Sequence, residues 1–273
     1  MNICPKISII TVNLNNGIAI RKTIESVINQ TFTDYEYIVI DGGSKDGSLD
    51  VIKEYADKIS YWISEPDNGI YHAMNKGILK AKGEYCLFLN SGDSLYSEDI
   101  LEHVFDMNCT QDIITGDMLK LYSDGTTELD KGQAWERNKN GKSLTLYDMI
   151  TGTLNHSSSL IKRSLFDAHG LYDENYRIVS DWIFFLKTVG LCGIKVQYVD
   201  LILSVFDMNG ISNTRKKLLV QERKKAIESV VPESIYRDYY DIIFVYFYIF
   251  ESPFTFFVAR ALNKIIRFFR FRK

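Results

Sequence analysis

Several features are missing from this sequence, and each absence excludes a class of protein. The four cysteines have no pairwise spacing suited to a zinc site or a disulfide framework: Cys4, Cys86, Cys109 and Cys192. We therefore expect a reducing, cytoplasmic environment. The N-terminus begins a predicted strand almost at once, without a charged leader and an apolar segment, so no export signal is expected.

Two phosphate-binding signatures are also missing from the turns that follow the predicted strands. The loop that begins at Asp41 has neither the Gly-x-Gly-x-x-Gly spacing nor the Gly-Lys-Ser pattern. The sequence therefore supports neither a dinucleotide-binding fold nor a P-loop. The sequence also has no apolar run that reaches the roughly 17 to 25 residues of a membrane-spanning helix.

Hydrophobic patterns alternate between strand and helix over the first 106 residues. Short runs rich in β-branched residues predict strands at Lys6–Val12, Tyr35–Ile40, Ile59–Ile63 and Cys86–Leu89. Helical periodicity or turn chemistry predicts helices at Ile18–Ile28, Ser48–Tyr55, Gly69–Ala81 and Ser97–Phe105. This order predicts an α/β fold with a Rossmann-like, mostly parallel sheet flanked by helices.

The pattern is less regular after residue 106. We expect a strand at Asp112–Gly116, a polar stretch over Ser123–Gly141 and a helix at Ser164–His169. Another helix should begin at Asp181, and two closing strands should follow at Lys195–Val199 and Leu201–Phe206.

Polar residues follow three of the predicted strands at the point where each strand ends. Asn13 and Asn15 follow the first strand, Asp41 follows the second, and Asn90 and Asp93 follow the fourth. Open α/β sheets bind ligands beyond the carboxyl ends of their strands. Asp41 is either an acceptor for a base or ribose, or part of an ordinary Asp-Gly turn. Asp93 either belongs to a site for a metal ion and a diphosphate or, like Ser94, caps the next helix.

Five segments resemble, in order, the motifs of family 2 glycosyltransferases with the GT-A fold. They are Ser8-Ile-Ile-Thr-Val-Asn-Leu-Asn, Ile38-Val-Ile-Asp-Gly-Gly-Ser-Lys-Asp-Gly, Glu65-Pro-Asp-Asn-Gly-Ile-Tyr-His-Ala-Met-Asn-Lys-Gly-Ile, Leu87-Phe-Leu-Asn-Ser-Gly-Asp and Ser180-Asp-Trp-Ile-Phe-Phe-Leu. The resemblance covers roughly residues 6 to 215. It implies a domain over 1–231, with a nucleotide-sugar half at 1–106 and an acceptor half at 107–231.

The sequence departs from the family pattern at several positions. Asn90 and Gly92 stand where the family has the two aspartates of Asp-x-Asp, which leaves Asp93 as the carboxylate of that motif. A subgroup that modifies bacterial surface polysaccharides resembles this chain in having Leu-Asn-Ser-Gly-Asp. Leu14 and Gly42 replace a tyrosine and an aspartate that often hold uracil, and His72 stands where an aspartate is frequent.

The resemblance implies a role for each candidate site residue. Asp181 is the expected catalytic base, although an acid at a helix start is also favoured by the helix dipole. Asp93 is the expected ligand of Mg²⁺ or Mn²⁺. His156 and Trp182 are expected near the acceptor or the pyrophosphate, with a purely structural role for the histidine as the alternative. The expected contacts of the nucleotide sugar are Thr11, Val12, Asn13, Asp41, Gly43, Asn75, Asn90 and Ser91.

The resemblance also implies a reaction and its partners. The expected enzyme is a metal-dependent inverting transferase that moves a hexosyl or N-acetylhexosaminyl group from a UDP-sugar to a saccharide or polyprenyl-linked acceptor in bacterial surface polysaccharide biosynthesis. The alternatives are a non-catalytic sugar-nucleotide-binding or scaffold protein, and a nucleotidyltransferase. A nucleotidyltransferase usually carries an N-terminal glycine-rich loop with a basic residue, and this sequence has no such loop.

The C-terminal segment 232–273 has a distinct composition and predicts a helical extension. Two apolar runs, Ile242–Phe250 and Phe254–Ala259, precede a series of Lys and Arg residues. The overall charge is −3, yet residues 237–273 carry +4. This pattern predicts a peripheral helix on the anionic inner face of the cell membrane, or alternatively a helical pair that packs on the body or on a second subunit. Nucleic-acid binding is not expected, because the basic residues lie in a hydrophobic segment and not on a folded basic face.

Overall fold

The computed structural model describes residues 4–139, 141–210 and 215–238. The chain divides into two compact units, residues 1–210 and 211–273, which we describe separately. The domain boundaries expected from the sequence stay predictions, and the two apolar runs of the C-terminal segment lie outside the described residues.

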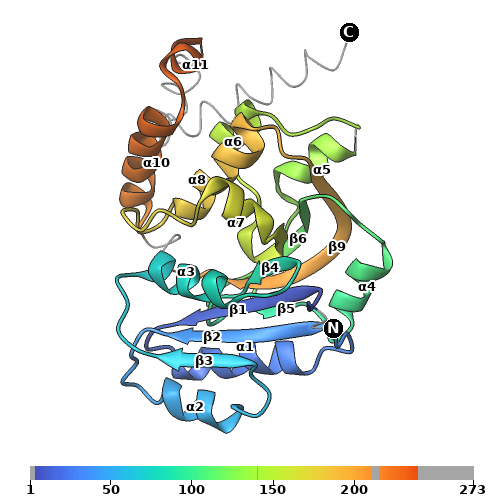
Figure 1. The fold of residues 1–273 in the computed structure, drawn as a ribbon, viewed down its shortest axis with the longest axis vertical. Coiled ribbons are helices and arrows are strands. Elements are labelled where there is room, and N and C mark those ends of the chain that lie inside the picture. Colours follow the sequence, from blue (N-terminus) through green and yellow to red (C-terminus); the bar gives the residue numbers. More distant parts are fainter. Residues whose placement is uncertain (1–3, 140, 211–214, 239–273) are drawn as a thin grey trace. The chain divides into compact units, whose positions relative to one another are not determined.

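The first part of the larger unit is a parallel sheet with helices on both faces (Figure 1). Its strands are β1 (Ile7–Asn13), β2 (Tyr35–Asp41), β3 (Tyr61–Ser64) and β4 (Tyr85–Phe88). Its helices are α1 (Gly17–Ile28), α2 (Ser48–Glu54), α3 (Ile70–Lys80) and α4 (Ile100–Asp106). The elements predicted from the hydrophobic pattern are therefore present, with bounds that differ by only a few residues.

Strand β1 lies at the centre of this parallel sheet and is buried along its whole length. Ile10 pairs with Ile38 of β2 on one side and with Phe88 of β4 on the other. Successive side chains of a strand point to opposite faces. Ile7 and Ile9 join the core formed with α1, α2 and α4, whereas Ile10 lies against α3.

The second part of the larger unit extends this sheet with mainly antiparallel pairs. The strands are β5 (Ser94–Leu95), β6 (Ile113–Leu121), β7 (Thr127–Asp130), β8 (Ser159–Lys162) and β9 (Val196–Asp207). The helical segments are α5 (Gly132–Asn138), α6 (Leu146–Thr151), η1 (His156–Ser158), α7 (Ser164–His169), α8 (Ser180–Phe185) and the π-helix η2 (Leu186–Leu191). The strand order is β3-β2-β1-β4-β8-β6-β9-β5, with β7 on β6. The expected α/β class is confirmed, and the parallel pairs are those within β3-β2-β1-β4 and between β6 and β9.

The polar stretch 123–141 contains strand β7 and helix α5. One expectation for the second part was wrong. The two closing strands are one strand, β9, which continues through Asp200. Asp200 does not end the strand because its carboxylate receives hydrogen bonds from Lys131 (3.0 Å) and Tyr198 (3.1 Å).

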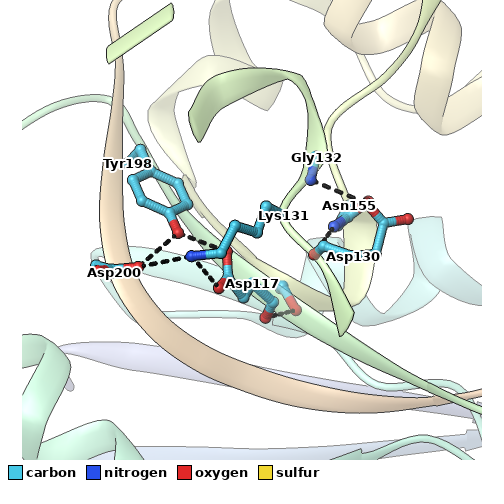
Figure 2. Close-up of polar contacts among 8 residues, drawn as sticks. Asp117, Asp130, Lys131, Gly132, Asn155, Tyr198 and Asp200 are labelled. Atoms are coloured by element: carbon cyan, nitrogen blue, oxygen red, sulfur yellow. Dashed lines mark hydrogen bonds and ion pairs between the residues drawn. The ribbon is translucent and has the colours of Figure 1, made fainter. Parts of the chain in front are cut away.

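A polar cluster of Asp117, Lys131, Tyr198 and Asp200 joins β6, β9 and the start of α5 (Figure 2). Tyr198 Oη donates to Asp117 Oδ1 (2.5 Å), and Lys131 Nζ lies 3.3 Å from Asp117 Oδ2. Asp117 is 3% exposed and sits where the register of β6 and β9 shifts. Asn155 Nδ2 donates to the carbonyl of Asp130 (3.3 Å), next to Lys131. The cluster therefore anchors the chain just before His156.

The smaller unit contains helices α10 (Lys216–Val230) and α11 (Glu233–Asp238) among its described residues. Val231 N–H donates to the carbonyl of Ile227, and Tyr236 N–H donates to the carbonyl of Pro232. A search of the described residues finds no helix that is long and apolar enough to cross a membrane.

We predict that Gly77→Ala destabilises the protein although alanine favours helices. A Cβ at Gly77 would lie 2.5 Å from Ile10 Cγ2. Alanine gains about 1 kcal/mol in helix propensity, but overpacking typically costs about 1 to 3 kcal/mol. We expect a net loss of roughly 1 kcal/mol in the free energy of unfolding, measured by urea denaturation.

The matched test uses the Ile10→Leu background, which lacks the γ2 methyl group. There Gly77→Ala should cost less than in the wild type. Equal losses in the two backgrounds would contradict the packing argument.

Candidate active site

The turn after β2 is built around the carboxylate of Asp41, which is completely buried. It accepts five hydrogen bonds, from the backbone N–H groups of Gly43 and Ser44 and from the side chains of Asn13, Ser44 and Ser64. Burial by itself raises the pKa of Asp41, but these donors outweigh it and the pKa is lowered. Both carboxylate oxygens thus serve the protein itself. The expected contact of Asp41 with a nucleotide stays a prediction.

The ends of β1, β2 and β4 are joined by direct hydrogen bonds. Asn13 Nδ2 donates to Asp41 Oδ1 (2.7 Å), and its own Oδ1 is buried without a partner among the described residues. Asn16 Nδ2 donates to the carbonyl of Ser91 (3.0 Å), and Ser91 N–H donates to the carbonyl of Val12 (3.1 Å). The structure therefore brings the predicted polar residues of three strand ends to one edge. Thr11 lies deeper, where its hydroxyl pairs with Tyr37 Oη (3.0 Å).

The two glycines after Asp41 allow close approach of the segment after β3. Gly43 has φ +81°, and a Cβ there would lie 3.3 Å from the backbone nitrogen of Pro66. A Cβ at Gly42 would clash with the carboxylate of Asp67, which lies against this glycine beside Leu14. A carboxylate thus reaches position 42 from a different element, although the sequence has glycine where the family often has aspartate.

The turn after β4 carries Asn90 and Asp93, each with a buried oxygen that lacks a partner among the described residues. Asp93 does not cap α4, because that helix begins at Ile100 after Asp99. The other oxygen of Asp93 accepts the backbone N–H of Asp207 (3.0 Å). Burial, together with the negative charge of Asp207, raises the pKa of Asp93 to about 7.

Asp93 and Asp207 form a carboxylate pair that suits a divalent cation. A Cβ at Gly92 would lie 3.1 Å from Asp207 Oδ2, so the second carboxylate lies against the same turn. No group of three or more His, Cys, Asp or Glu side chains that could hold a metal ion is present in the described part of the chain. Mg²⁺ commonly takes one or two protein carboxylates and completes its shell with phosphate oxygens and water. The unpartnered oxygen of Asp93 fits this donor set.

Asp181 lies in the first turn of α8 and is half-buried. Tyr71 Oη, from α3, donates to Asp181 Oδ1 (2.7 Å). Within the described residues, no hydrogen bond to Oδ2 of Asp181 is found. One oxygen of Asp181 is therefore held by Tyr71, and the other has no hydrogen bond within the described residues.

His156 packs against the end of β4 and contacts Tyr172. Its ring stacks on Phe88 at 4.8 Å between centroids, and its Nε2 is 2.8 Å from Tyr172 Oη. Burial lowers the pKa of His156, and the nearby Asp181 carboxylate only partly opposes this. The imidazole is therefore neutral at pH 7.

Asn75 and Trp182 are used for packing in this structure. Asn75 holds the backbone of Tyr172 through both its amide nitrogen (2.9 Å) and its amide oxygen (3.0 Å). Trp182 Nε1 donates to the carbonyls of Met149 (2.7 Å) and Gly152 (3.0 Å). Their predicted contacts with nucleotide and acceptor remain predictions, and the observed contacts position Tyr172 and α8.

Four residues of the site were not among the predicted site residues: Asp67, Tyr71, Tyr172 and Asp207. Tyr71 and Asp67 lie within the segment after β3 that resembles a family motif, and that context was a usable signal for these two. Asp207 is the last residue of β9. Tyr172 has no such signal, because its role depends on contacts with Asn75 and His156.

Comparison with known proteins identifies similar chains. The model of the family described as "Glycosyl transferase family 2" matches residues 8–170. A PGL/p-HBAD biosynthesis glycosyltransferase of Mycobacterium tuberculosis is 28% identical over 217 residues, which is 77% of this chain and 80% of the relative.

Two solved structures share the fold. S. aureus TarS 1–349 in complex with UDP is 18% identical, with a TM-score of 0.65, over 91% of this chain and 72% of that chain. The chain spans 44% of a longer TarS structure. The mannosyltransferase PcManGT from Pyrobaculum calidifontis, in complex with GDP-Man and Mn²⁺, is 15% identical, with a TM-score of 0.67, over 95% of this chain and 74% of that chain.

We predict that Asp41→Asn destabilises the protein at neutral pH and that the loss shrinks in acid. The variant turns an acceptor of five hydrogen bonds into a side chain that is partly a donor, which should cost roughly 2 to 4 kcal/mol. Because the folded pKa of Asp41 is below its usual 3.8, its stabilisation is present above the unfolded pKa. It is lost as the pH falls through the folded pKa.

The measurement is urea denaturation of wild type and variant at pH 7 and at about pH 3. Asp57→Asn, at a side chain that is 73% exposed, is the control and should have little effect at either pH. An equal loss for Asp41→Asn at both pH values would show that its charge does not stabilise the turn.

Proposed function

This chain belongs to glycosyl transferase family 2, and we propose that it transfers a sugar from a UDP-sugar to a saccharide acceptor with inversion at the anomeric carbon. The observation that carries the proposal is the contrast between two carboxylates. Asp93 is buried beside a second carboxylate and has an oxygen without a partner. Asp181 is half-buried, with one oxygen held by Tyr71. The first suits a cation and the second suits a base.

The donor is proposed to bind at the edge formed by the ends of β1, β2 and β4. The Asp41 turn presents a glycine backbone there, and Asn13 and Asn90 each offer a buried oxygen without a partner among the described residues. The carboxylate of Asp67 lies beside Gly42, and its proposed role is to accept hydrogen bonds from the base. The TarS structure with UDP, which has the same fold, supports a uridine nucleotide as the donor.

Mg²⁺ or Mn²⁺ would be held by Asp93 and Asp207 together with the donor diphosphate. When bound, such a cation neutralises the charge that develops on the leaving diphosphate. The PcManGT structure with Mn²⁺ supports this assignment. With a cation present Asp93 stays ionised, because the cation offsets the burial that raises its pKa.

Asp181 accepts the proton of the acceptor hydroxyl in the proposed reaction. The acceptor oxygen forms a bond to the anomeric carbon while the bond from that carbon to the diphosphate oxygen breaks. The electron pair of the broken bond leaves with UDP, and the proton moves to Asp181. Because the entering and leaving oxygens lie on opposite faces of the sugar, the configuration inverts.

The acceptor is proposed to be a lipid-linked saccharide in bacterial surface polysaccharide biosynthesis. The relative in M. tuberculosis is a PGL/p-HBAD biosynthesis glycosyltransferase, which supports a glycan on a lipid carrier. We place the protein in the cytoplasm, on the inner face of the membrane. The basic and aromatic composition of residues 242–273 supports this location.

Measurements of turnover test the proposed reaction. With a panel of UDP-sugars, Mn²⁺ and a lipid-linked acceptor extract, wild type should release UDP in an acceptor-stimulated reaction. Asp181→Asn should reduce kcat by roughly 100- to 10,000-fold, because it removes a general base. Asp93→Ala should lose the cation-dependent release of UDP, because it removes a proposed ligand of the cation.

Asp57→Asn, at an exposed side chain, is the matched control and should keep full activity. A wild type that binds UDP but releases none with any donor, together with unchanged UDP binding by Asp181→Asn, would favour a non-catalytic sugar-nucleotide-binding protein. That alternative is motivated by Asn90 and Gly92 in place of the usual aspartates.

Flotation with vesicles tests the proposed membrane association. The full chain should float with vesicles that contain anionic phospholipid and should float less at high salt, because each Lys or Arg near such a surface adds about 1 kcal/mol. The triple variant Arg267→Glu, Arg270→Glu and Arg272→Glu should remain in the soluble fraction. Equal flotation of the triple variant would contradict the electrostatic part of the proposal.

A further inference from the structure

Tyr71 and Asp181 form a hydrogen bond that links two elements far apart in the sequence. Tyr71 is in α3 and Asp181 is in α8, 110 residues later, and the distance from Oη to Oδ1 is 2.7 Å. The tyrosine is 4% exposed. Because an ionised carboxylate only accepts hydrogen bonds, the phenol is the donor.

Helix α8 alone does not fix the position of the Asp181 carboxylate. The helix has six residues, continues directly into the π-helix η2, and carries Asp181 at its second position. A side chain in the first turn of so short a helix keeps rotamer freedom unless a partner restricts it. Tyr71 supplies that partner from the opposite side of the site.

The surroundings of Asp181 contain three titratable groups from three different segments. They are Tyr71 of α3, His156 of η1 and Tyr172 of the segment before α8. Burial and then the charge of Asp181 raise the pKa of both tyrosines well above 10. Burial lowers the pKa of His156. All three are therefore neutral near pH 7, and Tyr71 remains a proton donor over the whole working range.

We propose that Tyr71 is a positioning residue for the catalytic base, holding Oδ1 of Asp181 so that Oδ2 faces the acceptor hydroxyl. The inference rests on the proposed function, in which Asp181 accepts the acceptor proton. Tyr71 thereby sets the orientation of the base.

A substitution can separate the hydroxyl of Tyr71 from its ring, and this distinguishes positioning of Asp181 from simple packing. The ring of Tyr71 packs against Tyr172, with centroids 5.7 Å apart. Tyr71→Phe keeps that ring and removes only the donor. Tyr85→Phe is the matched control, because Tyr85 is also completely buried and its hydroxyl donates to the carbonyl of Gln111 (2.9 Å), away from Asp181.

The experiment measures kcat and the KM for donor for wild type and both variants. For Tyr71→Phe we expect kcat to fall about 10-fold, with the donor KM within about two-fold of wild type. Tyr85→Phe should match the wild type in both quantities. An unchanged kcat in Tyr71→Phe would overturn the proposal.

A second readout does not need turnover. Protein with carbon-labelled aspartate carboxyls is compared by NMR at pH 7, and the Asp181 signal is the one missing from Asp181→Asn. Its chemical shift should change in Tyr71→Phe and stay in place in Tyr85→Phe, and an unchanged shift in Tyr71→Phe would overturn the proposal. The two failures are distinguishable, because full turnover by Asp181→Asn contradicts the proposed function and not the contact with Tyr71.

Discussion

The buried carboxylate of Asp41 organises the edge of the sheet on which the candidate site is built. A buried charge is costly unless hydrogen bonds replace its hydration. Here the replacement comes from three places, namely Asn13 at the end of β1, the backbone and hydroxyl of the turn after β2, and Ser64 at the end of β3. Satisfying one carboxylate therefore fixes three strand ends relative to one another. The glycine backbone that follows is held in a defined position beside Asp67.

Two other carboxylates show how environment separates chemical roles within one fold. Asp93 sits in a buried turn beside Asp207, where its charge is unfavourable until a cation compensates it. Asp181 is half-buried and receives a hydrogen bond from a tyrosine that remains protonated. Carboxyl groups whose surroundings differ in this way commonly divide the tasks of a reaction between them. Phe88, His156 and Tyr172 form the packed connection between the two regions.

Much of the first half of the fold could be predicted from the sequence, because its signals are local. Ile20, Ile24 and Val27 are buried in α1 as the helical spacing indicates, and β1, β2 and β4 read as short apolar runs that end in polar turns. The gathering of Asn13, Asp41 and Ser91 at one edge follows from the parallel order of these strands. The partners of Asp41 could not be predicted, since Ser64 comes from a strand that ends 23 residues later.

The wrong expectation for Asp200 and the omission of Tyr71 have the same physical origin. Asp200 looks like a strand end until Lys131 and Tyr198 are placed beside it, and Tyr71 looks like an ordinary core residue until α8 is packed against α3. In each case a tertiary contact between distant segments decides the role of a side chain. The most direct test of inverting transfer with Asp181 as the base is the anomeric configuration of the product, determined by NMR coupling constants with a donor that supports turnover. The account predicts a configuration opposite to that of the donor, and a product that retains the donor configuration would contradict it.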